Sequence, residues 1–167
     1  MGKEIRFGTD GWRGRIADNY TFANVRRVAQ GYASYLKETG DADRGVVIGY
    51  DHRFLGEHFA NVVAEVMAGN GIKVFLTAGA MPTPVISFAI LWKHAGGAVN
   101  ITASHNPPED NGFKIRAGYG GAVAQENLAA VEKNIPESMD GVTLMGLEEA
   151  EEAGLVEYID PSEAYIQ

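Results

Sequence analysis

Apolar residues recur at three- and four-residue steps in four stretches of the chain, and this spacing predicts amphipathic helices. Thr21 is a suitable N-terminal cap for the first helix, and Gly40 is suited to closing it. Thr83 is expected to cap the third helix, with Pro84 at its first position. The predicted helices cover residues 21–39, 59–67, 84–92 and 125–134.

Short apolar runs lie between these helices and predict buried strands. They cover residues 46–50, 72–77, 98–102 and 113–116. Strands that alternate with amphipathic helices are typical of a layered α/β domain. Only about ten residues separate the last two strands, too few for a helical crossover, so we expect them to pair antiparallel. The predicted fold is a three-layer α/β/α sandwich with a mixed, mainly parallel four-stranded sheet.

Composition points to one soluble domain. The chain has 167 residues, of which 46% are hydrophobic, enough for a full core. It has no cysteine, so no disulfide or thiolate metal site is expected. No stretch is long and apolar enough to cross a membrane, and the N-terminus lacks the apolar region of a signal peptide. We therefore expect a cytoplasmic protein with no membrane partner.

The net charge of −8 is unevenly distributed. Residues 1–135 carry about +1, whereas residues 136–167 carry −9 and contain no Lys or Arg. A nucleic-acid partner would require a clustered basic face, which the sequence lacks, so none is expected. Because the first 135 residues are nearly neutral, an anionic ligand would have to be held by local positive charge.

The segment from Thr102 to Arg116 reads TASHNPPEDNGFKIR and carries the densest chemistry. It places Ser104 at the carboxyl end of a predicted strand, where open α/β sheets bind ligands. His105 follows at once, and a turn at Asn111-Gly112 would bring Lys114 across from the serine. These groups suit a hydroxyl that accepts and releases phosphate, although a polar turn with incidental residues fits the chemistry equally well. A Ser–His–Asp hydrolase is disfavoured because no G-x-S-x-G motif occurs.

The same segment resembles the signature of the α-D-phosphohexomutases, the family of phosphoglucomutase and phosphomannomutase. A second match is FGTDGWRG at residues 7–14, and weaker ones are VVIGYDHR at residues 46–53 and PTP at residues 82–84. The four matches occur in the family's order and together span roughly residues 5–135. Thr102 and Trp12 look more like the glucose and mannose branches than the glucosamine branch.

The resemblance implies a role for each matching residue. Ser104 corresponds to the serine that donates its phosphoryl group to a sugar monophosphate and recovers one from the resulting hexose 1,6-bisphosphate. His105 and Lys114 correspond to residues beside the transferring group. Arg13 corresponds to a basic residue that reaches the site from the N-terminal loop, and its alternative role is a surface ion pair. Mg²⁺ would touch this chain only through the phosphate oxygen of Ser104.

Other parts of the family's active site are expected to lie outside this chain. The metal loop Asp-Gly-Asp-x-Asp-Arg belongs to a second domain, and the sugar-binding loops to later ones. Residues 39–44 imitate the metal loop, but Thr39 replaces its first carboxylate, and a helix end followed by a solvated loop is expected there. The expected partners are therefore a phosphorylated hexose and the remaining mutase domains, and the isolated chain is expected to be inactive.

The acidic C-terminal segment marks the predicted domain limit. We interpret residues 1–136 as the phosphoserine domain and residues 137–167 as a connector toward a missing second domain; a frayed terminus is the alternative. Two other functions remain possible from the sequence. One is a non-catalytic sugar-phosphate-binding or regulatory module derived from the same domain, and the other is a small serine phosphatase, for which no metal site or arginine clamp is evident.

Overall fold

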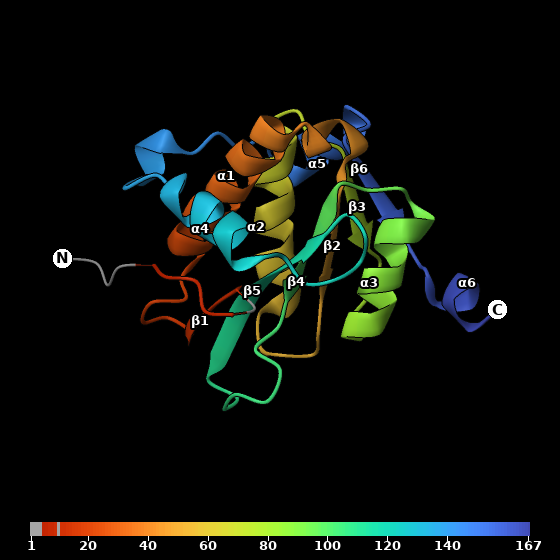
Figure 1. Ribbon diagram of the computed structural model, residues 1–167, viewed down its shortest axis with the longest axis horizontal. Helices are drawn as coiled ribbons and strands as arrows, with labels where there is room; N and C mark the ends of the chain where they lie inside the picture. Colours follow the sequence, from red (N-terminus) through yellow and green to blue (C-terminus); the bar gives the residue numbers. More distant parts are fainter. Residues whose placement is uncertain (1–4, 10) are drawn as a thin grey trace.

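The computed structural model describes residues 5–9 and 11–167 (Figure 1). Its helices are α1 Phe22–Thr39, α2 Gly56–Gly69, α3 Thr83–Trp92, α4 Gln125–Lys133, α5 Leu147–Glu152 and α6 Ser162–Ile166. Its strands are β1 Gly11–Arg15, β2 Val46–Tyr50, β3 Val74–Thr77, β4 Gly97–Ile101, β5 Asp110–Ala117 and β6 Val156–Ile159. Two short 3₁₀ helices, η1 Asp41–Arg44 and η2 Met139–Gly141, complete the described structure.

The strands form one mixed sheet in the order β1-β5-β4-β2-β3-β6. Strands β4, β2, β3 and β6 run parallel, whereas β5 pairs antiparallel with both β4 and β1. Helices α1, α2 and α4 cover one face of the sheet and α3 covers the other (Figure 1). The three-layer mixed α/β class is therefore confirmed, but the sheet has six strands instead of the predicted four.

The two additional strands lack the hydrophobic runs that mark a buried strand. In β1, only Trp12 is buried. Strand β6 lies at the edge of the sheet within the acidic segment, and only its two end residues, Val156 and Ile159, are buried. Both strands are held by backbone pairing to a neighbour, which local sequence does not reveal.

The first helix begins and ends as predicted. The Thr21 hydroxyl accepts a hydrogen bond from the Asn24 N–H (3.2 Å), and Gly40 closes the helix in the left-handed conformation at φ 80°. The predicted cap of α3 is wrong: Thr83 is the first helical residue and Pro82 occupies the cap position. The Thr83 hydroxyl instead accepts a hydrogen bond from the Asn100 side chain (2.9 Å), which ties α3 to β4.

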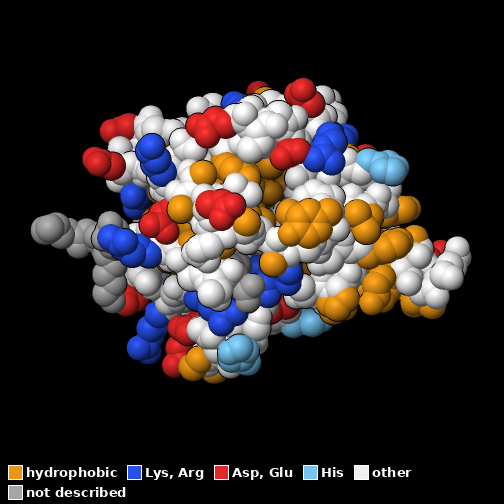
Figure 2. Space-filling model, in the orientation of Figure 1, with side chains coloured by type: hydrophobic (Ala, Val, Ile, Leu, Met, Phe, Trp, Pro, Cys, Tyr) orange, Lys and Arg blue, Asp and Glu red, His pale blue; other side chains and the backbone are white. Residues whose placement is uncertain are grey.

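Two hydrophobic cores hold the layers together. The larger lies between the sheet and helices α1 and α2 and includes Trp12, Tyr20 and Phe59. Tyr20 stacks on Trp12 with ring centroids 4.7 Å apart and meets Phe59 edge-on at 4.8 Å. This cluster anchors β1 to the body of the domain. The smaller core lies beneath α3. Exposed hydrophobic side chains gather over α3 and α6 (Figure 2).

Residues 137–167 pack against the rest of the chain. The Thr143 N–H donates to Gln30 Oε1 and the Met145 N–H donates to the Glu65 carbonyl, both at 3.0 Å. A Cβ at Gly69 would lie 2.5 Å from the Leu144 backbone, so glycine permits the close approach of this segment to α2. Strand β6 then extends the sheet beside β3. The predicted domain limit at residue 136, and the connecting role of residues 137–167, stay predictions.

Candidate active site

Two loops meet at the carboxyl end of the parallel strands, at the lower edge of the molecule in Figure 1. We call residues 102–110 the serine loop; they comprise the connection from β4 to β5 and the first residue of β5. The arginine loop, residues 51–55, joins β2 to α2. Strands β2 and β4 are direct neighbours in the sheet, so their following loops lie side by side. This is the edge at which open α/β sheets bind ligands.

Ser104 is an exposed residue in a backbone conformation unusual for a side chain other than glycine, with φ 51°. Its N–H donates to the Thr102 hydroxyl (3.0 Å), which in turn donates to Asp51 Oδ2 (2.5 Å). Ser104 lines an open hollow of about 620 Å³ together with residues of the arginine loop. The serine is thus presented to solvent from a backbone that is fixed on its N-terminal side.

The chain reverses earlier than predicted. Asn106 N–H donates to the Ala103 carbonyl (3.0 Å) and Asp110 N–H to the Pro107 carbonyl (3.1 Å), so the turn lies within residues 103–110. Asn111 and Gly112 are not a turn but part of β5, where they pair with Gly14 and Arg13 of β1. Gly112 is required there because a Cβ would lie 2.4 Å from the Thr102 carbonyl oxygen.

Because of this earlier turn, the predicted position of Lys114 opposite Ser104 is wrong. Lys114 pairs with Asn100 on β4 and with Gly11 on β1. Strand β5 begins at Asp110, so Phe113 pairs with Ile101 at the end of β4, and the Gly112 carbonyl accepts a hydrogen bond from the Thr102 N–H just beyond it (3.1 Å). Lys114 nevertheless lines a narrow crevice that Thr102 and Arg13 also border.

Arg13 reaches the serine loop from β1. Its Nη1 donates to Asn106 Oδ1 (2.9 Å), and the Asn106 amide donates to Asp110 Oδ2 (3.0 Å). Arg13 and His105 also line a hollow of about 480 Å³ together with Arg6. Three basic or titratable side chains around one hollow favour an anionic ligand. The structure therefore brings Arg13, Ser104 and His105 to one edge of the sheet.

The surface at this edge is rich in Lys, Arg and His side chains, with acidic ones between them (Figure 2). Within residues 5–9 and 11–167, no group of three or more His, Asp or Glu side chains is arranged to hold a metal ion. Asp51, which borders the Ser104 hollow, is already bonded to Thr102 and 3.8 Å from the Nε of Arg53. The described side chains therefore do not form a Mg²⁺ ligand set of their own.

Arg53 and Asp51 are site residues that reasoning from the residues alone missed. Arg53 donates four hydrogen bonds to carbonyl oxygens of the serine loop, at 2.7–2.9 Å. The available signal was an acid and an arginine two residues apart directly after a buried strand, at the carboxyl edge of the sheet. Which loop these two side chains contact depends on the order of the strands in the sheet, and that order cannot be predicted from local sequence patterns.

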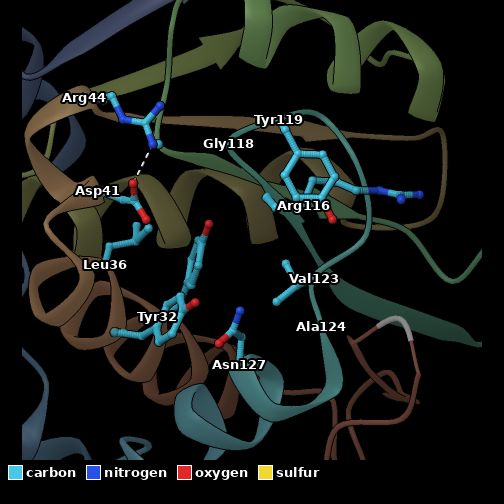
Figure 3. Close-up of a pocket in the computed structure, with 13 residues that line it drawn as sticks. Tyr32, Leu36, Asp41, Arg44, Arg116, Gly118, Tyr119, Val123, Ala124 and Asn127 are labelled. Carbon is cyan, nitrogen blue, oxygen red and sulfur yellow. Dashed lines mark hydrogen bonds and ion pairs between the residues drawn. The ribbon is translucent and has the colours of Figure 1, made fainter.

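A second pocket, of about 480 Å³, lies at the opposite end of β4 (Figure 3). Tyr32 and Asn127 point into it, and an ion pair between Asp41 and Arg44 borders it. Burial raises the pKa of Tyr32 and of Tyr35, so their hydroxyls stay protonated. The pocket contains neither Ser104 nor any residue of the serine loop and is separate from the candidate site.

None of the helices in the described part of the chain has the length and apolar character that a membrane crossing requires.

Fold and site together define an α/β domain that presents an exposed serine beside arginine and histidine at the carboxyl edge of its sheet. The profile of the family described as "Phosphoglucomutase/phosphomannomutase, alpha/beta/alpha domain I" matches residues 4–141. The chain belongs to this family.

Individual relatives agree with this assignment. The chain is 43% identical over 113 residues to a candidate phosphomannomutase of Haemophilus influenzae, a match that covers 64% of this chain and 23% of the relative. It is 35% identical over 138 residues to a phosphoglucomutase of Staphylococcus haemolyticus, which covers 79% of this chain and 24% of that protein.

A solved structure also matches closely. The crystal structure of a candidate phosphomannomutase from Thermus thermophilus superposes with a TM-score of 0.85 at 41% identity. The match covers 99% of this chain and 35% of that one. The chain thus spans about a quarter to a third of the length of these relatives.

Proposed function

We propose that this chain is the phosphoserine-bearing domain of a phosphohexomutase, which interconverts hexose 1-phosphate and hexose 6-phosphate. The observation that carries the proposal is the exposed Ser104, held in a bonded loop beside the hollow that Arg13 and His105 line. Family membership supports the same reaction class. As part of the same proposal, we place the protein in the cytoplasm, the location expected from the sequence.

In the proposed reaction, Ser104 carries a phosphoryl group at the start. The bond between Ser104 Oγ and phosphorus breaks while a hydroxyl oxygen of the hexose monophosphate bonds to that phosphorus, and the hydroxyl proton passes to a base. The hexose 1,6-bisphosphate then returns its other phosphoryl group to Ser104 Oγ and regains a proton at the oxygen released. His105 is the candidate for proton transfer, and Arg13 and Lys114 are the candidates for stabilising charge.

Parts of the reaction would depend on groups outside this chain. Mg²⁺ would be held through the phosphate oxygen of Ser104 and by carboxylates of a remaining domain, and it would neutralise charge on the transferring group. The hexose would be selected by the remaining mutase domains as well. Hexose 1,6-bisphosphate would serve as the activator that first phosphorylates Ser104.

Phosphate labelling of Ser104 tests this proposal. The chain is incubated with a hexose 1,6-bisphosphate and the remaining mutase domains, followed by intact-mass measurement and peptide mapping. We expect one added phosphoryl group on the peptide that contains Ser104, and none on Ser104→Ala. Ser138→Ala, an exposed serine outside the site, is the matched control and should label normally. Equal labelling of Ser104→Ala would refute the proposal, and absence of any labelling would favour a non-catalytic sugar-phosphate-binding or regulatory module.

A further inference from the structure

The side chain of Arg53 lies in the arginine loop, but it donates four hydrogen bonds to the serine loop. We propose that Arg53, oriented by Asp51, is a positioning residue that fixes Ser104 for phosphoryl transfer. This inference rests on the proposed function for its catalytic consequence, whereas its structural part concerns the loop alone.

The guanidinium group of Arg53 gathers the backbone of the serine loop. Its Nη1 donates to the carbonyls of Pro107 (2.8 Å) and Asp110 (2.9 Å). Its Nη2 donates to the carbonyls of Ser104 (2.8 Å) and Asn106 (2.7 Å). The four carbonyls span one reversal of the chain, and all of them point toward a single side chain that is only 13% exposed.

These four hydrogen bonds account for the donors on the two Nη atoms of the guanidinium group. An arginine side chain has five N–H groups, four of them on the two Nη atoms. In the described structure, each Nη atom has two carbonyl acceptors, and Nε lies 3.8 Å from Asp51 Oδ2. The Nη groups of Arg53 are therefore fully used by the serine loop, and its Nε faces Asp51. Its effect on the reaction has to pass through the loop.

Asp51 links Arg53 to the backbone N–H of Ser104 through a chain of hydrogen bonds. Its Oδ1 accepts from the Arg53 N–H (3.0 Å) and its Oδ2 accepts from the Thr102 hydroxyl (2.5 Å). The Thr102 hydroxyl accepts in turn from the Ser104 N–H (3.0 Å). The N–H of Ser104 is thus fixed through Thr102 and Asp51, and its carbonyl is fixed by Arg53.

This double attachment explains how Ser104 keeps its left-handed backbone, φ 51°, in an exposed loop. A non-glycine residue pays a steric penalty in that region, so it reverts when its neighbours are free to move. Phosphoryl transfer depends on holding the donor in line with the acceptor, and small displacements are costly to the rate. Fixing both sides of the Ser104 backbone would supply this orientation.

Hydrogen exchange measured by NMR on the 167-residue chain tests the structural part. In Arg53→Lys, a single ammonium group cannot bond four carbonyls at once, so the Ser104 and Asn106 amides should exchange about tenfold faster or more. Amides in the middle of α1 should change by less than about twofold. Arg27→Lys is the matched control, because Arg27 also donates to a backbone carbonyl, that of Pro136 (2.7 Å), away from the loop.

Asp51→Asn provides a second variant, for which acceleration is expected at the same loop amides. Unchanged loop exchange in both variants would overturn the inference. So would equal acceleration of every amide, because that would indicate a general loss of stability instead of a released loop.

The catalytic part requires the chain together with the remaining mutase domains. Arg53→Lys should lower kcat by about tenfold or more and change KM for the sugar phosphate by less than about twofold, because the Nη groups of Arg53 are bonded to the serine loop and would act through it. A dominant rise in KM, or an unchanged kcat, would overturn the positioning role. If Ser104 never becomes phosphorylated in the unmodified chain, the proposed function fails, and the exchange experiment still decides whether Arg53 holds the loop.

Discussion

Ser104 combines an exposed hydroxyl with a strained backbone. The left-handed region costs a residue with a Cβ about 1–2 kcal/mol, and glycine adopts it freely. Three other non-glycine residues, Ala17, Leu55 and His94, share this conformation among the described residues. At Ser104, the strain coincides with the side chain that we propose to carry phosphate.

The strain at Ser104 predicts different stabilities for two variants that both lack the hydroxyl. Ser104→Gly should be more stable than Ser104→Ala by about 1 kcal/mol, because only alanine retains the Cβ that conflicts with φ 51°. Urea denaturation monitored by circular dichroism measures the difference. Ala17→Gly is a suitable control, since Ala17 is exposed, has φ 69°, and should gain a similar amount. Equal stability of the two Ser104 variants would show that this backbone is not strained.

Ser104, His105 and Arg13 could be singled out as candidates from the sequence because each lies in a short, distinctive segment. The sequence misplaced Lys114 because the register of β5 depends on where the preceding turn ends, and that turn lies within residues 103–110. It could not assign Arg53, because the partners of this side chain are carbonyls more than fifty residues away in the chain. Contacts between loops require the strand order, which local patterns do not contain.

At the scale of elements, hydrophobic patterning predicts the buried parts of the sheet and fails at its edges. Strands β2 and β4 are buried throughout and read as apolar runs. Strand β6 is an edge strand whose Glu157 lies between two lysines: Lys93 Nζ is 2.7 Å and Lys73 Nζ 3.7 Å from its carboxylate. These contacts connect β6 to the end of α3 and to the residue before β3.

The hydrogen bond from Lys93 lowers the pKa of Glu157 below its usual value of 4.5. Because the folded chain favours the ionised carboxylate, this stabilisation is complete well above pH 4.5 and is lost as the pH falls through the lower folded pKa. Glu157 is 42% exposed, so solvent screening limits the effect. Glu157→Gln should therefore lower the free energy of unfolding at pH 7 by about 0.5 kcal/mol.

The difference between the wild-type chain and Glu157→Gln should vanish in strongly acidic solution, where the carboxyl is protonated in both the folded and the unfolded state. Urea titrations at a series of pH values measure it. Glu148→Gln, an exposed residue on α5, should show little difference at any pH. A Glu157→Gln effect that grows as the pH falls would contradict the predicted sign.

At the scale of the whole molecule, the site is open. The hollow beside Ser104 is lined by the serine and arginine loops, and the one beside His105 by β1 and the residues before it; the described residues supply no metal ligand set. The relatives are about three to four times longer than this chain. Under the proposed function, the acceptor sugar and the metal carboxylates would come from those remaining domains.

We therefore expect the 167-residue chain alone to have little or no mutase activity. A coupled assay that detects glucose 6-phosphate formed from glucose 1-phosphate measures this, with hexose 1,6-bisphosphate and Mg²⁺ present. Adding the remaining mutase domains should restore turnover with the wild-type chain but not with Ser104→Ala, because only the former can carry the phosphoryl group. Robust turnover by the chain alone, free of contaminating enzyme, would mean that its own loops bind the sugar. Release of inorganic phosphate without isomerisation would instead identify a phosphatase.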